Sequence, residues 1–471
     1  MKTKFLLALW TVVFAFVYFH ATDAFDQDLG RHLKLGEIIV STREVPKTNL
    51  FSYTNANEPV FNSHWGSQVI FYGIHKAFGV SGLILLNTII NTLAFGMLFL
   101  LAVRRAGLLI PSILVIPFLF ILLDRTWIRP EMFGNLFFAV ILLTLFVTNI
   151  RQKVKKFFPL IAVLWINLHI TAVIGVVAMG LVLLEDSISS KGSRQARTIS
   201  LNSLIFVGTL FALLVNPYGF EGMLSAFTVL NKYGYSIVEN QSWFFLKDFG
   251  FPLVAHIFFG FFVLLASFFA RKRRPGIFEL LLLLMISVLT LRFVRNEILF
   301  AFAAFLTASL NFAPFQPRKT QPIFIAILLA MSAFFVNSSH REHGLPTGLG
   351  SRESYKNGVD FFLTENLQGP IFNNFDIGGY LIYRLYPKEK VFVDNRPEAY
   401  PVAFFQKEYI PMQIDERVFR EFAKKYNFQT IVWGTHDITP WSRDFLTFIV
   451  KNPDWKAVYT DDAMVIYTKV P

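Results

Sequence analysis

The stretch LILLNTIINTLAFGMLFLLAVRR (residues 83–105) decides the fold class. Its run up to Val103 carries no charge and is about 20 residues long, the length that an α-helix needs to cross the hydrocarbon core of a bilayer. The rest of the chain has the same character, because 54% of its 471 residues are hydrophobic, only 16% are charged and 55 are phenylalanine. Soluble domains carry about 25% charged residues, so this composition predicts a polytopic α-helical membrane protein.

Apolar runs of this kind recur along the chain, and we expect eleven transmembrane helices. The predicted spans are residues 5–21, 81–102, 107–123, 132–149, 157–168, 170–184, 199–215, 251–270, 276–291, 297–312 and 321–337. The fifth and sixth are short, and they form either two helices or one helix that is kinked around His169.

The basic residues between these spans set the predicted orientation. They gather in every second linker, whereas nearly all acidic residues before the tail lie in the other linkers. Because cytoplasmic linkers are enriched in Lys and Arg, we expect a cytoplasmic N-terminus, with residues 22–80 and the tail outside a plasma membrane. This clustering accounts for the net charge of +12 without a nucleic-acid partner. The chain has no Cys, which excludes disulfides and Cys nucleophiles.

The chain is therefore predicted to have two domains. Residues 1–338 form a membrane domain with a long first outer loop (residues 22–80), and residues 339–471 form an extracytoplasmic domain. In this tail, the predicted strands PIFNN, KVFVD and QTIVWG alternate with helices, and a β-hairpin ends the chain. Alternating strands and helices favour an α/β fold, so we expect a small, mostly parallel sheet with flanking helices.

The first outer loop begins with the most informative polar segment, DQDLGRHLKLGE (residues 26–37). Asp26 and Asp28 are two residues apart, and Arg31 and His32 follow them. A carboxylate beside a membrane is able to act as a general base, and Arg is suited to holding a phosphate. From composition alone, an ordinary polar juxtamembrane loop is the simpler interpretation.

The pattern D-x-[DE]-x-x-R-H directly after a first span resembles the first outer loop of the GT-C glycosyltransferases, membrane enzymes whose donor is a sugar on a polyprenyl phosphate. The resemblance implies that Asp26 is the catalytic base and Asp28 the second acid, with Arg31 and His32 binding the donor phosphate. It also implies a GT-C-like fold and a juxtamembrane helix in this loop, for which HWGSQVIFYGIHKAFG (residues 64–79) is the candidate. The alternative is that residues 64–79 are the polar start of the second span.

Other polar residues are expected at the outer ends of the spans. Asp124 and Arg129 lie in the second outer loop, just before the fourth span. GT-C enzymes often carry a second acidic motif in this loop, for which Asp124 and Glu131 are the candidates. His169 and Glu239 lie in further outer linkers, and they are either site residues or structural ones.

LRFVRNEILF (residues 291–300) places Arg292 and Arg295 at an outer membrane face. Cationic side chains in a membrane cost free energy unless they are paired. The phosphate of a lipid donor would be one partner. Glu297 and lipid headgroups are the alternatives.

The densest motif of the tail is IFNNFDIGGYLIYRLYP (residues 371–387) followed by KVFVDNRPE (residues 390–398). Asp376 and Tyr380 belong to a segment similar to the WWDYG region of oligosaccharyltransferase subunits, although both tryptophans are missing and a Gly is inserted. Asp394 ends the predicted strand KVFVD and Arg396 follows it, at a position where α/β domains often place binding groups. These four residues are candidates for the acceptor side of a site; a glycine-based turn is the structural alternative.

The sequence thus predicts a glycosyltransferase of the hexosyltransferase type in the cell envelope, which transfers a sugar from a polyprenyl-phosphate donor to a glycan, lipid or protein acceptor. Asp28 is a candidate ligand for Mg²⁺ or Mn²⁺. Two other functions remain open. A transporter or flippase is one, although the span interiors hold few ionisable groups; a non-catalytic assembly protein is the other.

Overall fold

In the computed structural model, residues 2–23, 28–228, 233–248, 254–317 and 321–470 are described. Contacts divide the chain into two compact units. Unit 1 comprises Met1–Ala21, Ser81–Met223 and Ser236–Gly350, and unit 2 comprises Thr22–Val80, Leu224–Tyr235 and Ser351–Pro471. The predicted boundary near residue 338 grouped the first outer loop with the spans, whereas these contacts group it with the tail.

Unit 1 is helical. Its helices are α1 (Lys2–Tyr18), the second part of α3 (Trp65–Ala106), α4 (Leu109–Leu123), α5 (Glu131–Phe146), α6 (Thr148–Val154), α7 (Phe158–Leu168), α8 (Ala172–Ser189), α9 (Ser193–Ala212), α11 (Trp243–Asp248), α12 (Val254–Ala270), α13 (Ile277–Arg292), α14 (Glu297–Phe312) and α15 (Pro322–Glu342). Every predicted span overlaps one of these helices, and residues 251–253 of the eighth span lie outside the described residues. Their core is rich in aromatic rings; Phe95 packs against both Phe14 and Phe305, with ring centroids 4.9 Å apart in each pair.

Several described helices are long and apolar enough to cross a membrane. Four meet this criterion by length and composition: Trp65–Ala106, Ala172–Ser189, Val294–Phe315 and Pro322–Glu342. Shorter apolar helices are Thr3–Tyr18, Leu109–Leu123, Glu131–Phe146 and Val254–Ala270. These helices are those of a membrane protein, and the count of eleven spans stays a prediction.

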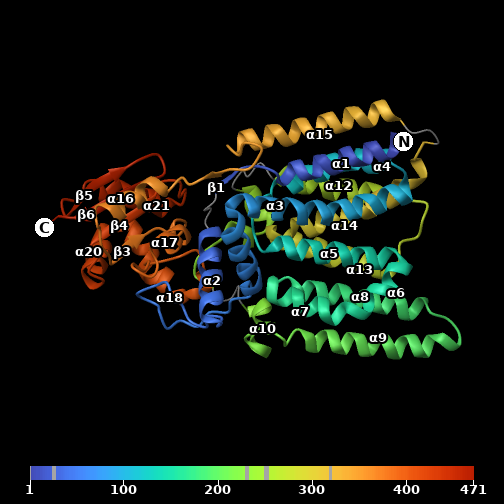
Figure 1. The fold of residues 1–471 in the computed structure, drawn as a ribbon, viewed down its shortest axis with the longest axis horizontal. Helices are drawn as coiled ribbons and strands as arrows, with labels where there is room; N and C mark the ends of the chain where they lie inside the picture. Colours follow the sequence, from blue (N-terminus) through green and yellow to red (C-terminus); the bar gives the residue numbers. More distant parts are fainter. Residues whose placement is uncertain (1, 24–27, 229–232, 249–253, 318–320, 471) are drawn as a thin grey trace. The chain divides into compact units, whose positions relative to one another are not determined.

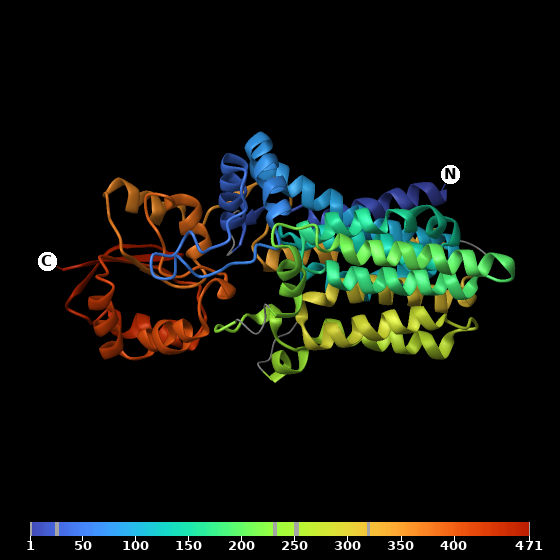
Figure 2. The same ribbon diagram turned by 90° about the horizontal axis from the view of Figure 1, so that it is seen from below.

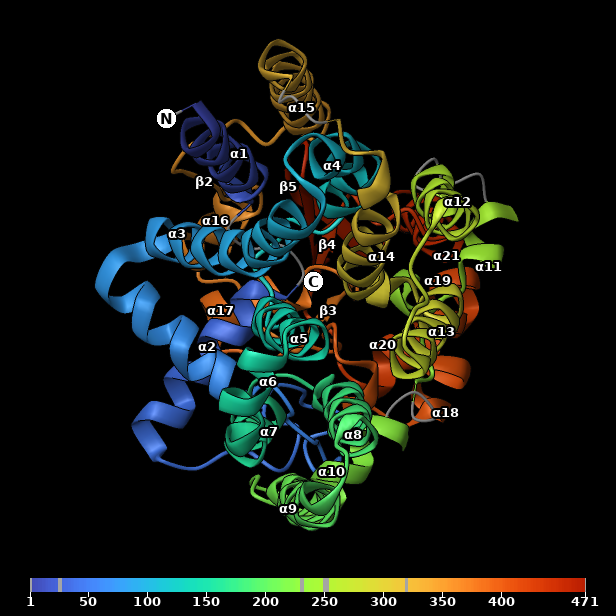
Figure 3. The same ribbon diagram turned by 90° about the vertical axis from the view of Figure 1, so that its right-hand side faces the viewer.

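The fifth and sixth predicted spans are two helices. His169, between α7 and α8, has an extended backbone (φ −159°, ψ 142°), which ends α7. The chain then folds back, so that α7 and α8 pack against each other and both contact α9. Figures 1 and 2 show these three helices lying alongside one another, and Figure 3 shows them end-on.

The helix α3 contains a sharp kink at Gly79, where φ is 62° and ψ is −160°. This left-handed conformation is one that glycine adopts readily. The kink separates residues 65–78, which belong to unit 2, from the apolar stretch that belongs to unit 1. Residues 64–79 therefore supply a helical segment distinct from the second predicted span, as expected of the juxtamembrane candidate.

Unit 2 combines the first outer loop with the tail around a small sheet. Its helices are α2 (Leu29–Thr42), the first part of α3, α16 (Lys356–Thr364), α17 (Gly378–Leu385), α18 (Val402–Phe404), α19 (Ile410–Ile414), α20 (Glu416–Lys425) and α21 (Pro440–Ile449); α10 (Gly219–Thr228) straddles the division between the units. Its strands are β1 (Thr22–Asp23), β2 (Ser351–Arg352), β3 (Ile371–Asn373), β4 (Thr430–Gly434), β5 (Trp455–Thr460) and β6 (Met464–Lys469).

The sheet of the tail corrects the expected strand arrangement. Its order is β3-β4-β6-β5, and only β3 and β4 pair in parallel. The prediction of a mostly parallel sheet was wrong because the terminal hairpin β5–β6 joins β4 antiparallel. The predicted strand KVFVD is also outside this sheet: Val391 forms an isolated bridge with Ser52 of the first loop instead.

Two glycines let α2 pack closely within unit 2. A Cβ atom on Gly30 would lie 2.8 Å from the backbone oxygen of Gly379 in α17. A Cβ atom on Gly36 would lie 2.2 Å from the backbone oxygen of Gln68 in α3. Because backbone cannot move aside cheaply, these positions fix α2 against both neighbours.

Gly36→Ala is therefore expected to destabilise unit 2 by about 1–3 kcal/mol, the usual cost of overpacking. Hydrogen exchange of the full-length chain would show this as faster exchange in α2 and in residues 65–78. Gly73→Ala in the same part of α3 is the matched control, since a Cβ there meets nothing within 4 Å. Equal exchange in Gly36→Ala and the unmodified chain would contradict this packing.

Candidate active site

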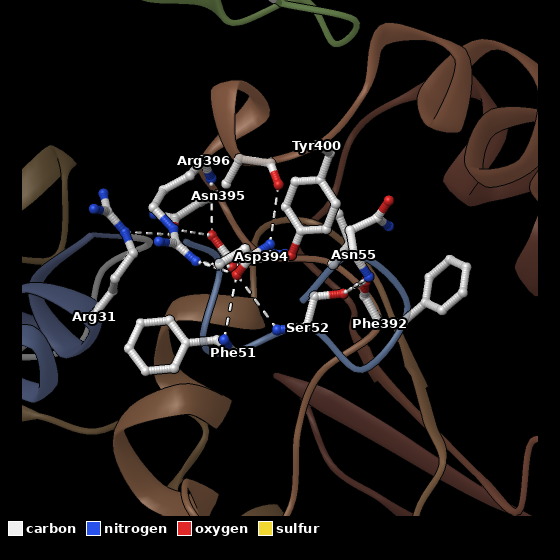
Figure 4. Close-up of polar contacts among 12 residues, drawn as sticks. Arg31, Phe51, Ser52, Asn55, Phe392, Asp394, Asn395, Arg396 and Tyr400 are labelled. Carbon is white, nitrogen blue, oxygen red and sulfur yellow. Dashed lines mark hydrogen bonds and ion pairs between the residues drawn. The ribbon is translucent and has the colours of Figure 1, made fainter. Parts of the chain in front are cut away.

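The acidic pair of the first loop is only partly described, since Asp26 lies outside the described residues. Asp28 directly precedes α2, and its Oδ1 accepts hydrogen bonds from Arg31 Nη2 at 2.7 Å and from Asn395 Nδ2 at 2.6 Å. Arg31 Nε in turn donates to Asn395 Oδ1 at 3.1 Å (Figure 4). One amide of the tail thus holds both the carboxylate and the guanidinium of the first loop.

His32 lies one position further along α2 and is buried. Gln68 Nε2 lies 3.2 Å from its Nδ1, and Gln68 also exchanges two hydrogen bonds with Asn62. The ring of His64 lies 5.9 Å from the ring of His32, centroid to centroid. The first loop therefore provides its own polar support for this histidine.

Asp394 and Arg396 form a buried ion pair in the tail (Figure 4). Arg396 donates from Nε and Nη2 to the two carboxylate oxygens, each at 2.7 Å, and Tyr400 donates to Asp394 Oδ2 at 3.0 Å. Arg396 Nη2 also donates to Asn49 Oδ1 of the first loop at 2.9 Å. Burial lowers the pKa of Arg396, but the adjacent Asp394 more than offsets this, and the pKa lies above its usual value.

A pocket opens beside this pair, entirely within unit 2. We call it the loop pocket; its volume is about 20 Å³, room for little more than a water molecule. Its polar and aromatic lining includes Arg31, Thr48, Phe61, His64, Arg396 and Glu398. Burial raises the pKa of the Glu398 carboxyl, although Arg31 and Arg396 oppose that shift. Residues from the first loop and the tail thus make one polar recess next to Asp28.

Asp376 and Tyr380 lie at the start of α17. Asp376 is half-buried in the turn that follows β3. Tyr380 is buried, and its hydroxyl accepts a hydrogen bond from Arg384 at 2.8 Å and lies 3.4 Å from Glu353 Oε2. Burial raises the pKa of Tyr380, so its hydroxyl stays protonated.

Unit 1 carries a second group of charges, which we call the rim cluster. It consists of Arg125, Arg129, Glu131, Glu239, Arg295 and Glu297. Arg125 is its centre: it donates to both carboxylate oxygens of Glu131, at 2.7 and 3.1 Å, and to Glu239 at 3.0 Å. Arg129 also donates to Glu239. The predicted residues Arg129 and Glu239 are therefore direct partners.

The two arginines of LRFVRNEILF differ in their surroundings. Arg295 lies 3.8 Å from Glu239 rather than pairing with Glu297, which faces Arg125 at 3.8 Å. Arg292 is exposed, lies over the ring of Phe293 at 5.4 Å, and forms no ion pair with any residue that the structure describes. Of the two arginines, Arg292 is thus the more accessible to an external anion.

The remaining predicted residues of unit 1 have local partners. Asp124 Oδ2 lies 3.5 Å from His256 Nδ1, a partner in α12 that the sequence did not indicate. His169 Nδ1 lies 2.7 Å from the hydroxyl of Thr171, two residues later. A turn-capping role suits this histidine, which sits where the chain reverses between α7 and α8.

The structure places the predicted residues in two sets. Unit 2 holds Asp28, Arg31, His32, Asp376, Tyr380, Asp394 and Arg396, and unit 1 holds Asp124, Arg129, His169, Glu239, Arg292 and Arg295. A single pocket that unites both sets stays a prediction. Asn395 was missed, although it stands between two predicted residues in DNRPE; its role depends on a contact across 367 residues of sequence.

A divalent metal finds no ready-made set of ligands among the described residues. In that part of the chain, no three His, Asp or Glu side chains gather closely enough to hold an ion. Asp28 offers one carboxylate, already bonded to Arg31 and Asn395. Binding of Mg²⁺ or Mn²⁺ at Asp28 therefore stays a prediction.

Comparison with solved structures bears on the fold. ArnT from Cupriavidus metallidurans bound to undecaprenyl phosphate matches 100% of this chain and 97% of its own, with a TM-score of 0.57 and 12% identity. The archaeal oligosaccharyltransferase AglB from Archaeoglobus fulgidus, in complex with an inhibitory peptide and a dolichol-phosphate, matches 100% of this chain and 74% of its own, with a TM-score of 0.55 and 13% identity. This chain has the GT-C fold. The resemblance predicted from DQDLGRH is thus confirmed at the level of the fold.

A third structure with the GT-C fold extends this likeness. The arabinofuranosyltransferase AftD from Mycobacteria matches 99% of this chain but 42% of its own, with a TM-score of 0.54 and 15% identity. No family model and no curated protein sequence matches the chain. At such low sequence identities, a shared GT-C fold does not establish the role of any residue. Residue roles must be argued from the geometry of this chain.

Proposed function

We propose that this chain is an integral membrane glycosyltransferase that transfers a sugar from a polyprenyl-phosphate donor to an extracytoplasmic acceptor. The observation that carries the proposal is the arrangement of Asp28, Arg31 and Asn395 at the start of the first outer loop, in a chain with the GT-C fold. It supplies a fixed carboxylate and a fixed guanidinium one helical turn apart, and the predicted base Asp26 is two residues before Asp28 in the sequence.

The proposed reaction is a direct displacement. A hydroxyl oxygen of the acceptor attacks the anomeric carbon of the donor sugar, and the bond from that carbon to the phosphate oxygen breaks. Asp26 takes the proton of the hydroxyl, which makes the oxygen a better nucleophile. The polyprenyl phosphate leaves with the bonding electron pair. Asp28 assists by keeping Arg31 in place or by holding a divalent cation.

The departing phosphate gains negative charge and needs fixed cations around it. Preorganised cations and hydrogen-bond donors stabilise such charge strongly in a site that excludes water. We assign this role to Arg31, His32, Arg292 and Arg295. The exposure of Arg292 and its lack of an ion pair within the described chain support its part in this set.

The proposed location is the plasma membrane, with the N-terminus in the cytoplasm and unit 2 outside.

Transport is the less favoured function. Asn87 and Asn91, the main polar residues within a predicted span, are occupied in internal hydrogen bonds: Asn87 donates to the carbonyl of Thr126 at 2.8 Å, and Asn91 donates to Asn87 Oδ1 at 2.8 Å. Such pairing favours helix packing over a path for a substrate.

Purified protein in proteoliposomes tests the proposal. Supplied with a panel of polyprenyl-phosphate-linked sugars and a lipid or glycan acceptor, it is expected to release polyprenyl phosphate and form one glycosylated product. A dithionite assay on the same liposomes measures lipid flipping. Flipping without transfer from any donor would reject the glycosyltransferase and favour the transporter.

A further inference from the structure

Two histidines meet where the first and the last helix of unit 1 end, and the proposed reaction uses neither of them. His20 follows α1 by two residues, and His340 lies in the last turn of α15. The two helices lie side by side (Figures 1 and 3). The imidazole rings are buried, and their centroids are 4.8 Å apart. An isolated β-bridge between His20 and Thr347, just after α15, fixes the backbone at this place.

Backbone carbonyls determine which nitrogen of each ring carries the proton. His20 Nδ1 lies 2.8 Å from the carbonyl oxygen of Ala21, and His340 Nε2 lies 3.1 Å from that of Val17. A carbonyl oxygen only accepts, so these nitrogens donate, and the other nitrogen of each neutral ring has a free lone pair. His20 Nε2 and His340 Nδ1 are sealed from solvent, and neither forms a hydrogen bond with any residue that the structure describes. Two adjacent rings thus each present an unused, buried acceptor.

The spacing of the rings fits a shared metal ion. A histidine that binds a metal through one nitrogen commonly donates the other N–H to a backbone carbonyl or carboxylate. Two imidazoles on one tetrahedral Zn²⁺ have ring centroids about 5 Å apart, because Zn–N bonds are about 2.0–2.1 Å long. Two imidazoles that share one water would be about 6 Å apart, because the N···O distance is about 2.8 Å. The observed 4.8 Å matches the ion.

The surroundings favour a cation with a preference for nitrogen. Both histidines lie at the C-terminal ends of helices, where the helix dipole attracts positive charge. Imidazole suits Zn²⁺, Cu²⁺ and Ni²⁺, whereas Mg²⁺ and Ca²⁺ prefer oxygen. We propose that His20 and His340 bind a zinc ion, which links α1 to α15. This site is independent of sugar transfer and of the cation predicted at Asp28.

The two histidines supply fewer ligands than the four of a structural zinc site. Among the described residues, no third His, Asp or Glu gathers with them. Residues 341–344 are exposed, so water from that side is able to complete the coordination. We therefore expect an exchangeable ion with a micromolar Kd.

Equilibrium dialysis of the full-length chain in nanodiscs against Zn²⁺ tests the site, with a purification tag that contains no histidine. One Zn²⁺ per chain is expected, and excess Mg²⁺ should not displace it. His20→Gln and His340→Gln should each weaken binding by more than about 100-fold, since even the loss of an outer-shell partner costs about 10–100-fold. His436→Gln, at an exposed position of unit 2, is the matched control and should bind zinc as before.

Hydrogen exchange gives a second readout that does not depend on counting ions. At a Zn²⁺ concentration 100 times Kd, exchange in the last turn of α15 is expected to slow by up to about 100-fold. Without zinc, equal exchange of α1 and α15 in a variant and in the unmodified chain shows that the variant is folded; the two variants are tested separately, so either one suffices. Absence of binding, displacement by Mg²⁺, or undiminished binding and protection in a folded His20→Gln or His340→Gln variant would overturn the zinc site.

Discussion

Asp26→Asn is expected to reduce sugar transfer by about 10²–10⁴-fold, the usual contribution of a positioned general base. Asparagine has nearly the same size as aspartate but cannot take a proton from the acceptor hydroxyl. The loss should appear in kcat, because the substitution removes a proton acceptor and leaves the binding groups in place. Initial rates of polyprenyl phosphate release from proteoliposomes give the measurement.

Two controls make this result specific. Glu44→Gln neutralises an exposed carboxylate in the same loop and should leave the rate unchanged. Hydrogen exchange of α2 should be the same in Asp26→Asn and in the unmodified chain, which shows that the fold is retained. A folded Asp26→Asn variant that works within threefold of the unmodified rate would remove Asp26 from the mechanism.

Asp394→Ala is expected to destabilise unit 2 by about 3–5 kcal/mol, because it leaves the Arg396 guanidinium buried without its counter-charge. The carboxylate is 0% exposed and accepts from Arg396 and Tyr400. Hydrogen exchange of the full-length chain should then be about 10²–10³-fold faster in β3 and β4, since each 1.4 kcal/mol is tenfold.

The matched control is an ion pair on the surface of the same unit. Arg417 faces Asp415 at 3.3 Å with its side chain 91% exposed. Exposed pairs contribute about 0–1 kcal/mol, so Arg417→Ala should change exchange in β3 and β4 by less than about fivefold. Similar effects of the two substitutions would mean that the Asp394–Arg396 pair does not hold the unit together.

The sequence was sufficient where local pattern decides structure. Each predicted span overlaps a described helix, and α7 ends at Leu168 while α8 begins at Ala172, which matches one of the two alternatives for this region. In the tail, β3, α17, β4 and the β5–β6 hairpin all lie on predicted elements. The prediction that KVFVD is a strand of the sheet was wrong. Its composition favours a strand, but Val391 bridges to Ser52 of the first loop, a partner that the tail sequence alone cannot indicate.

The candidate site was harder to predict from the sequence than the helices, because its contacts join residues that are far apart in the chain. Nothing near Asp28 indicates that Asn395 will bond to it, and nothing near Arg396 indicates Asn49. The residue types and their spacing indicated the charged residues of DQDLGRH and DNRPE as candidates. The neutral amides that hydrogen-bond to them form no recognisable sequence pattern. His256 opposite Asp124 is a similar case, because a single histidine in an apolar helix has no pattern around it.

The pairing of the first loop with the tail also sets an order of events during synthesis. Residues 22–80 emerge early, yet Val391 N donates to Phe51 O, Asn49 donates to Ala399 O and Tyr53 donates to Ile371 O, all of which arrive last. Until translation is nearly complete, this early segment lacks its partners in the tail, so the outer unit cannot be completed. If translation stops before the tail, the membrane helices are present, but the outer unit cannot assemble.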